Sequence, residues 1–105
     1  SAIGWAWALA LSEVAPDRSN ALLQRGRAFS QSRAVCGAHW KSDVEAGRLM
    51  GSAVVASLHS SEVFRAQLAQ ASQEVARARA QGVKPDEAAC AAEKEALGAT
   101  APLAP

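Results

Sequence analysis

The sequence predicts an all-α fold, a helical bundle, on three observations. Alanine, the strongest helix former, fills the gaps between larger apolar residues along much of the chain. Apolar residues recur at helical spacing, most clearly in the series Phe64, Leu68, Ala71 and Val75. Proline, glycine and serine punctuate the chain at intervals typical of globular helices. The 105 residues suffice for one small domain.

The first helix is expected over residues 1–14. Ile3, Trp5 and Trp7 alternate in a strand-like way, but the alanines between them favour helix. Because this helix is apolar on nearly every face, it needs neighbours on every face, and both tryptophans are interpreted as core residues. We therefore expect the natural sequence to begin upstream of Ser1.

The second helix is expected from Pro16 to Val35. Proline suits a first helical turn, and the adjacent Asp17 complements the helix dipole. Gly26, in mid-helix, costs about 1 kcal/mol relative to alanine unless a neighbouring helix packs closely there. The expected packed side of this helix comprises Leu22, Leu23, Ala28, Phe29 and Ser32.

A break follows at residues 36–38, where Gly37 can adopt a left-handed conformation. The third helix is expected from His39 or Trp40 to Leu58. Gly47 and Gly51 are four residues apart and share a face, which allows close helix contact. The expected apolar positions of this helix are Val44, Leu49, Ala53, Val54 and Leu58.

A fourth helix is expected to begin at residues 60–62, a Ser-Ser-Glu sequence, and to end near Gly82. The Pro-Asp-Glu sequence at residues 85–87 starts a fifth helix, which stops at Gly98. The domain organisation predicted is thus one helical domain over residues 1–98. A disordered Ala/Pro tail is expected over residues 99–105.

Composition argues against several function classes. Eleven Lys and Arg residues against ten Asp and Glu give a net charge of +1, with no basic stripe for nucleic acid. No run of 18 apolar residues could span a membrane. The two cysteines cannot form a zinc site from sulfur alone. They leave open a disulfide or, as the preferred interpretation, a buried Cys36 thiol with Cys90 facing a missing segment.

Residues 32–43 contain the candidate site. Arg33 falls in the last turn of one helix, and His39 falls at the start of the next. Asp43, four residues later, can orient the imidazole by accepting a hydrogen bond from one ring nitrogen. A guanidinium and the first amides of a helix both suit a phosphate group. Taken alone, a His and an Asp at this spacing are more often a surface ion pair.

The spacing of this segment resembles a known motif. Ser-Arg, five residues, His, three residues and Asp form the third motif of the phosphatidic acid phosphatase type 2 superfamily. The surrounding Val-Cys-Gly, His-Trp and Ala-Gly-Arg sequences are similar to those of bacterial class A non-specific acid phosphatases. The likeness extends over residues 1–68. The fixed positions of the motif are filled by Ser32, Arg33, His39 and Asp43.

This resemblance implies the C-terminal part of the phosphatidic acid phosphatase type 2-like fold and hydrolysis of phosphate monoesters through a phosphohistidine. His39 would be the nucleophile, Asp43 its orienting partner and Arg33 a phosphate-binding residue, with Ser32 structural. The family needs no metal or other cofactor. The resemblance further implies a periplasmic or secreted homo-oligomer.

Two earlier motifs of the family are absent: Lys separated by six residues from Arg-Pro, and Pro-Ser-Gly-His. We therefore expect a missing N-terminal segment to supply the acid histidine, and we expect the 105 residues alone to be inactive. The alternatives are a vanadate-dependent haloperoxidase, which uses the equivalent of His39 to hold vanadate, and a non-catalytic helical fragment. A membrane lipid phosphatase of the superfamily would need spanning helices.

Overall fold

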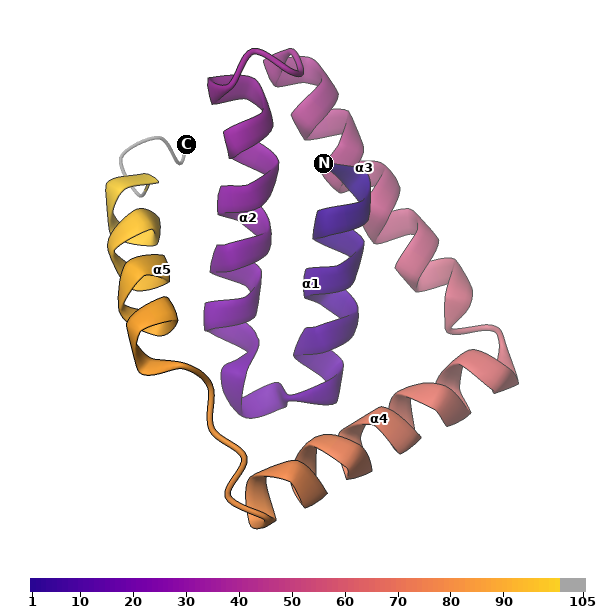
Figure 1. The fold of residues 1–105 in the computed structure, drawn as a ribbon. Helices are drawn as coiled ribbons and strands as arrows, with labels where there is room; N and C mark the ends of the chain where they lie inside the picture. The colour runs from indigo at the N-terminus through magenta and orange to yellow at the C-terminus, as the bar shows by residue number, and fades with distance from the viewer. Residues whose placement is uncertain (101–105) are drawn as a thin grey trace.

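The computed structural model describes residues 1–100, and it contains only helices, turns and bends over that range. The prediction of an all-α fold is therefore confirmed. The elements are α1 (Ala2–Val14), the short 3-10 helix η1 (Pro16–Arg18), α2 (Ser19–Val35), α3 (Lys41–Leu58), α4 (Glu62–Ala80) and α5 (Glu87–Thr100), as Figure 1 shows.

The helix α5 continues two residues past Gly98, where the sequence predicts its end. Of the tail expected at residues 99–105, the last five lie outside the described residues.

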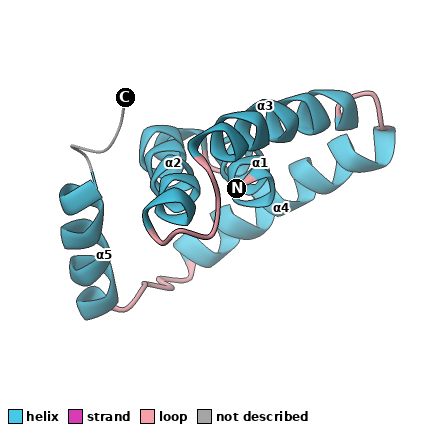
Figure 2. Cartoon of the chain, turned by 90° about the horizontal axis from the view of Figure 1, so that it is seen from above, coloured by secondary structure: helices cyan, strands magenta, loops and turns pink. Residues whose placement is uncertain are grey.

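The helix α1 lies between α2 and α3, with α4 crossing near its C-terminal end and α5 alongside α2 (Figure 1). Seen from above, α1, α2 and α3 form one group from which α5 stands apart (Figure 2). The start of α1 lies at the same end of the molecule as the turn that joins α2 to α3. This end holds the residues of the candidate site.

Close contacts of α1 depend on glycines in both neighbouring helices. A Cβ atom added at Gly26 of α2 would collide with the Cβ of Ala8. A Cβ atom at Gly51 of α3 would lie 2.7 Å from the carbonyl oxygen of Ala2. One at Gly47 would collide with Ser1. The close helix contacts expected at these three glycines are confirmed, and they compensate for the cost of glycine inside a helix.

The buried residues differ in part from the predicted apolar stripes. In α3 the buried positions are Val44, Gly51 and Val55, which recur at helical spacing on the face toward α1. Leu49 is on another face and is 75% exposed. In α2 the buried positions are Gly26 and Ser30. Small residues occupy these faces because α1 approaches too closely for larger ones.

Three further burial predictions are wrong. Phe29, expected on the packed side of α2, is 41% exposed because its ring lies over Gly4 at the edge of α1. Trp7, expected in the core, is 69% exposed, whereas Trp5 is half-buried and donates through Nε1 to Ser52 Oγ at 2.9 Å. Cys36, expected to be buried, is an exposed free thiol, as is Cys90.

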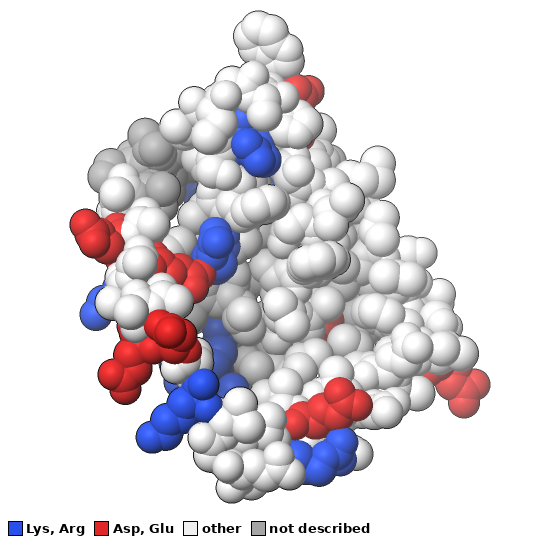
Figure 3. Space-filling model, viewed as in Figure 1, with Lys and Arg blue, Asp and Glu red and all other residues white. Residues whose placement is uncertain are grey.

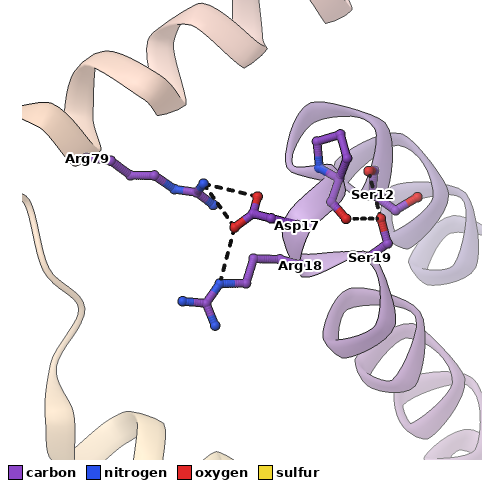
Figure 4. A network of polar contacts seen from close by, with 6 residues as sticks. Ser12, Asp17, Arg18, Ser19 and Arg79 are labelled. Carbon is purple, nitrogen blue, oxygen red and sulfur yellow. Dashed lines mark hydrogen bonds and ion pairs between the residues drawn. The ribbon is translucent and has the colours of Figure 1, made fainter.

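Polar contacts fasten the corner between α1 and α2 to the end of α4. The Arg79 Nη1 atom donates to both carboxylate oxygens of Asp17, at 3.1 and 3.2 Å (Figure 4). This hydrogen bond lowers the pKa of Asp17. Ser19 Oγ donates to the carbonyl oxygens of Ser12 and Pro16, which fixes the turn itself. Arg79 therefore links elements that are distant in the sequence.

His59 joins the C-terminal ends of α1 and α3. Its Nε2 atom lies 2.8 Å from Glu13 Oε2, and its Nδ1 atom lies 2.7 Å from the carbonyl oxygen of Val55. Both ring nitrogens thus face acceptors, an arrangement that suits the doubly protonated imidazolium. The hydrogen bond with Glu13, followed by that with Val55, raises the pKa of His59. His59 is also the C-cap residue of α3.

Replacing Gly26 with alanine should lower the free energy of unfolding by about 1 to 3 kcal/mol, because the added methyl group forces α1 away from α2. The matched control is Gly98→Ala in α5, where nothing lies within 4 Å of the new methyl group. That change should raise stability by up to about 1 kcal/mol. Denaturant unfolding followed by circular dichroism measures both. Equal effects of the two substitutions would contradict the close contact of α1 with α2.

The His59–Glu13 pair should make thermal stability depend on pH. Because the folded state raises the pKa of His59, the stabilisation is fully present below the unfolded pKa of about 6.5 and is lost as pH rises through the folded value. The difference in Tm between the wild type and Glu13→Gln should therefore shrink as pH rises from about 6 through the raised pKa of His59. For Glu45→Gln, which removes the partner of Lys41, the corresponding difference should stay constant over this range. A Glu13→Gln effect that does not vary with pH would rule out this pair as the source.

Candidate functional site

The turn between α2 and α3 is set by the C-terminal end of α2. Gly37, with φ of 71°, takes the left-handed conformation that the sequence predicts. The amide of Ala38 donates to the carbonyl oxygen of Arg33 at 2.9 Å, and that of Gly37 donates to Ala34 at 3.0 Å. These two bonds form a Schellman motif, which satisfies the free carbonyls of a helix end. The chain is thereby turned toward α3 within a few residues.

His39 belongs to this turn and not to the helix that follows it. Its amide donates to the carbonyl oxygen of Arg33 at 3.0 Å, and α3 begins two residues later at Lys41. The sequence predicts His39 at the helix start or one residue before it, so the helix begins slightly later than expected. The first free amides of α3 are consequently those after Trp40, and the amide of His39 is already bonded within the turn.

His39 and Asp43 lie together, as their spacing predicts. The His39 Nδ1 atom is 3.8 Å from Asp43 Oδ2, within ion-pair range and longer than a hydrogen bond. The same Oδ2 atom accepts a hydrogen bond from the amide of Trp40 at 2.9 Å and so caps the first turn of α3. Asp43 thus caps the helix start and lies within ion-pair range of the imidazole. The side chains of His39 and Asp43 are 44% and 48% exposed.

The Arg33 side chain makes no polar contact with this pair in the described part of the chain. Its Nε atom is buried and has no hydrogen-bond partner there. A buried, unpaired guanidinium nitrogen is costly, and an acceptor from outside these residues would satisfy it. Arg33 lines a groove of about 520 Å³ between α1 and α2.

Ser1 connects the two parts of the candidate site. It lines the same groove as Arg33, and its Oγ atom donates to the carbonyl oxygen of Asp43 at 3.5 Å. Its carbonyl oxygen accepts from Ser30 Oγ at 3.4 Å, which ties the start of α1 to α2. Ser1 therefore neighbours both Arg33 and Asp43, and Asp43 in turn lies beside His39.

Of the side chains next to the candidate site in the sequence, two are exposed to solvent and one bonds to the backbone of its own helix. Trp40 is 80% exposed. Lys41 is exposed, and its Nζ atom lies 3.9 Å from Glu45 Oε1. Ser32 Oγ donates to the carbonyl oxygen of Phe29 at 2.7 Å, in line with its expected structural role.

A second arginine, Arg48 of α3, has a buried Nη1 atom without a partner in the part of the chain that the structure describes. It lines a hollow of about 420 Å³ with Trp5, Arg27 and Ser52. In the sequence, Arg48 is part of the Ala-Gly-Arg segment that resembles class A acid phosphatases, but that resemblance assigns it no role. Over residues 1–100, no group of three or more His, Cys, Asp and Glu side chains is placed to hold a metal ion. No helix of this region is both long and apolar enough to cross a membrane.

Comparison with known proteins identifies relatives of one kind. No family model matches the chain. The chain is 46% identical to the acid phosphatase of Zymomonas mobilis over 94 residues, which cover 90% of this chain and 36% of the relative. It is 49% identical to the non-specific acid phosphatase of Providencia stuartii over 77 residues, or 73% of this chain and 31% of the relative.

The non-specific acid phosphatase of Salmonella typhimurium is 45% identical over 75 residues, or 71% of this chain and 30% of the relative. The chain therefore spans about a third of the length of the curated relatives it matches. Identities of this size over most of the chain reflect common descent. Over the stretch that it shares with them, the chain belongs to the family of bacterial non-specific acid phosphatases.

Proposed function

We propose that this chain forms part of a phosphatase that hydrolyses phosphate monoesters through a phosphohistidine on His39. The observation that carries the proposal is the pairing of His39 with Asp43 at the α2–α3 turn in a chain 45–49% identical to acid phosphatases. The relatives named above are phosphatases, which favours this activity over vanadate-dependent haloperoxidation. The resemblance to class A phosphatases further supports a periplasmic or secreted homo-oligomer that needs no metal.

The geometry of the pair supports different proposed roles for the two ring nitrogens. Because Nδ1 faces Asp43, a proton on Nδ1 leaves the lone pair on Nε2 free for attack. Nε2 bonds to phosphorus, the P–O bond of the ester breaks, and the leaving oxygen takes a proton from a general acid. Water then attacks the phosphohistidine, which releases inorganic phosphate and restores the imidazole. Asp43 is the positioning residue that fixes the proton on Nδ1.

Arg33 is proposed to bind the phosphoryl oxygens as negative charge shifts during transfer. Its buried Nε atom, unsatisfied within residues 1–100, supports an anionic partner at this end of the groove. A planar guanidinium can donate two parallel hydrogen bonds to a phosphate group. In the substrate complex the guanidinium would turn toward the phosphoryl group bound at His39.

The general acid is proposed to come from the part of a full-length phosphatase that this chain does not span. Of the two histidines, His39 is assigned as the nucleophile, and His59 lies at the opposite end of α3 in contact with Glu13. The chain spans about a third of its relatives' length, so ample polypeptide remains to supply this group. The 105 residues alone should therefore not turn over substrate.

The decisive experiment uses a chimera in which these 105 residues replace the matched stretch of the Zymomonas mobilis acid phosphatase. The chimera should hydrolyse p-nitrophenyl phosphate at acid pH, whereas the isolated chain should not. His39→Ala should lower kcat at least about a thousandfold, because the nucleophile is lost. Asp43→Asn keeps an oxygen that can cap α3. It should still lower kcat by about 10²- to 10⁴-fold, because the proton on Nδ1 of the imidazole is no longer fixed.

Radiolabelled phosphate should be trapped on His39 after an alkaline quench. Lys41→Gln is the matched control on the same helix turn, and it should leave kcat within about threefold of the wild type, because its exposed side chain has no assigned role. An active isolated chain would disprove the proposed division of the site. Full activity of the His39→Ala chimera would disprove the assignment of the nucleophile.

A further inference from the structure

The chain is flatter and more open than its length requires. Its radius of gyration is 15.1 Å, whereas a compact domain of about 100 residues has about 13 Å. The molecule measures 39 × 38 × 19 Å, so it is a slab one to two helices thick. Its accessible surface is 7328 Å², against about 5,600 Å² for a compact monomer of 10.9 kDa. The excess, about 1,700 Å², matches one side of a permanent interface.

Part of this surface is an apolar groove along α1 and α2, which we name the α1–α2 groove. Ile3 and Trp7 of α1 are 71% and 69% exposed, and both line it. Leu11, Leu22 and Phe29 continue the apolar lining. Solvated helices rarely expose an isoleucine and a tryptophan one turn apart, so this stripe indicates a contact surface.

The distribution of charged residues indicates what kind of partner could bind the α1–α2 groove. Of the residues that line the groove, only Arg25 and Arg33 are charged, and Arg25 is paired with Glu93 of α5. The surface over α1 is almost free of charged side chains, which gather along α5 and at the lower edge (Figure 3). An apolar segment without a dominant charge fits such a surface.

The position of the groove beside the candidate site indicates where the partner segment comes from. Ser1 and Arg33 form one end of it, and Ser1 also contacts the backbone of Asp43. A segment that covers the groove thus ends beside the candidate site. The proposed phosphatase mechanism requires a general acid and further phosphate-binding residues at that place. Almost two thirds of the length of the Zymomonas mobilis relative lies outside the matched stretch. A second copy of this chain would cover the groove without supplying these groups.

We propose that the α1–α2 groove is the contact surface for an apolar helix from the remaining two thirds of a full-length acid phosphatase, with Trp7 as its central anchor. The contact rests on the shape and polarity of the groove and on family membership. It holds whether or not His39 is the nucleophile.

The test measures protection of position 7 in the chimera described above, independently of activity. Trp7→Cys is introduced with Cys36→Ser and Cys90→Ser, and the rate of maleimide labelling at position 7 is followed by mass spectrometry. Labelling should be at least tenfold slower in the chimera than in the isolated chain, because the partner helix covers the groove. Glu74→Cys, on the exposed polar face of α4, is the control and should label at equal rates in both.

A second measurement does not need a folded chimera. The unmatched part of the Zymomonas mobilis protein is co-expressed with this chain as a separate polypeptide, and the affinity of the complex is measured. Trp7→Glu should weaken binding at least about thirtyfold, as expected for a central aromatic anchor. Met50→Glu, at an exposed apolar position of α3, should change it less than threefold.

Equal labelling of position 7 in chimera and isolated chain would overturn the proposal. So would binding that Trp7→Glu and Met50→Glu weaken equally, or the absence of a complex. Self-association of the isolated chain that Trp7→Glu abolishes, and that the complementary polypeptide does not displace, would assign the groove to a second copy instead.

Discussion

The contact of α1 with two glycine-bearing helices is the constraint on which the other features of this chain depend. Gly26 of α2 and Gly51 of α3 let α1 approach so closely that a single methyl group would not fit at either place. Close backbone approach replaces the large side chains that usually fill a helical core. For that reason the buried apolar residues between residues 1 and 100 are few and small: Ala8, Val44 and Val55.

This packing also determines the geometry of the candidate site. Because α2 and α3 flank one end of α1, the chain between them must reverse within five residues. Gly37 makes that reversal possible, and the carbonyl oxygen of Arg33 receives the amides of both Ala38 and His39. The imidazole then lies next to the first turn of α3, where Asp43 caps the helix and faces Nδ1. A helix end and a helix start, both stabilised by local bonds, thus hold His39 and Asp43 in a rigid frame, which the proposed role of His39 would require.

The sequence predicts where the helices begin and end better than it predicts which face of each helix is buried. Helix ends follow from local chemistry, such as the left-handed Gly37 and the cap at Ser61, whose Oγ accepts from the amide of Phe64 at 3.3 Å. The His39–Asp43 contact likewise follows from spacing alone. Burial depends on which helix lies opposite, so the positions of Leu49, Trp7 and Cys36 were not predictable from periodicity. The burial of the Arg33 Nε atom without a partner in the described residues is a tertiary feature of the same kind.

The exposed apolar face and the unsatisfied guanidinium have one physical explanation. A chain that buried its apolar groups alone would turn Trp7 inward and pair the Nε atom of Arg33 within its own fold. Here both remain open, and both lie along a single groove that ends at the start of α1. Other exposed apolar side chains, such as Leu49 and Met50, and a second unsatisfied guanidinium, that of Arg48, belong to α3 and lie outside this groove. Under our proposal, the helix that covers the α1–α2 groove would also reach Ser1, whose hydroxyl contacts the backbone of Asp43 in the candidate site.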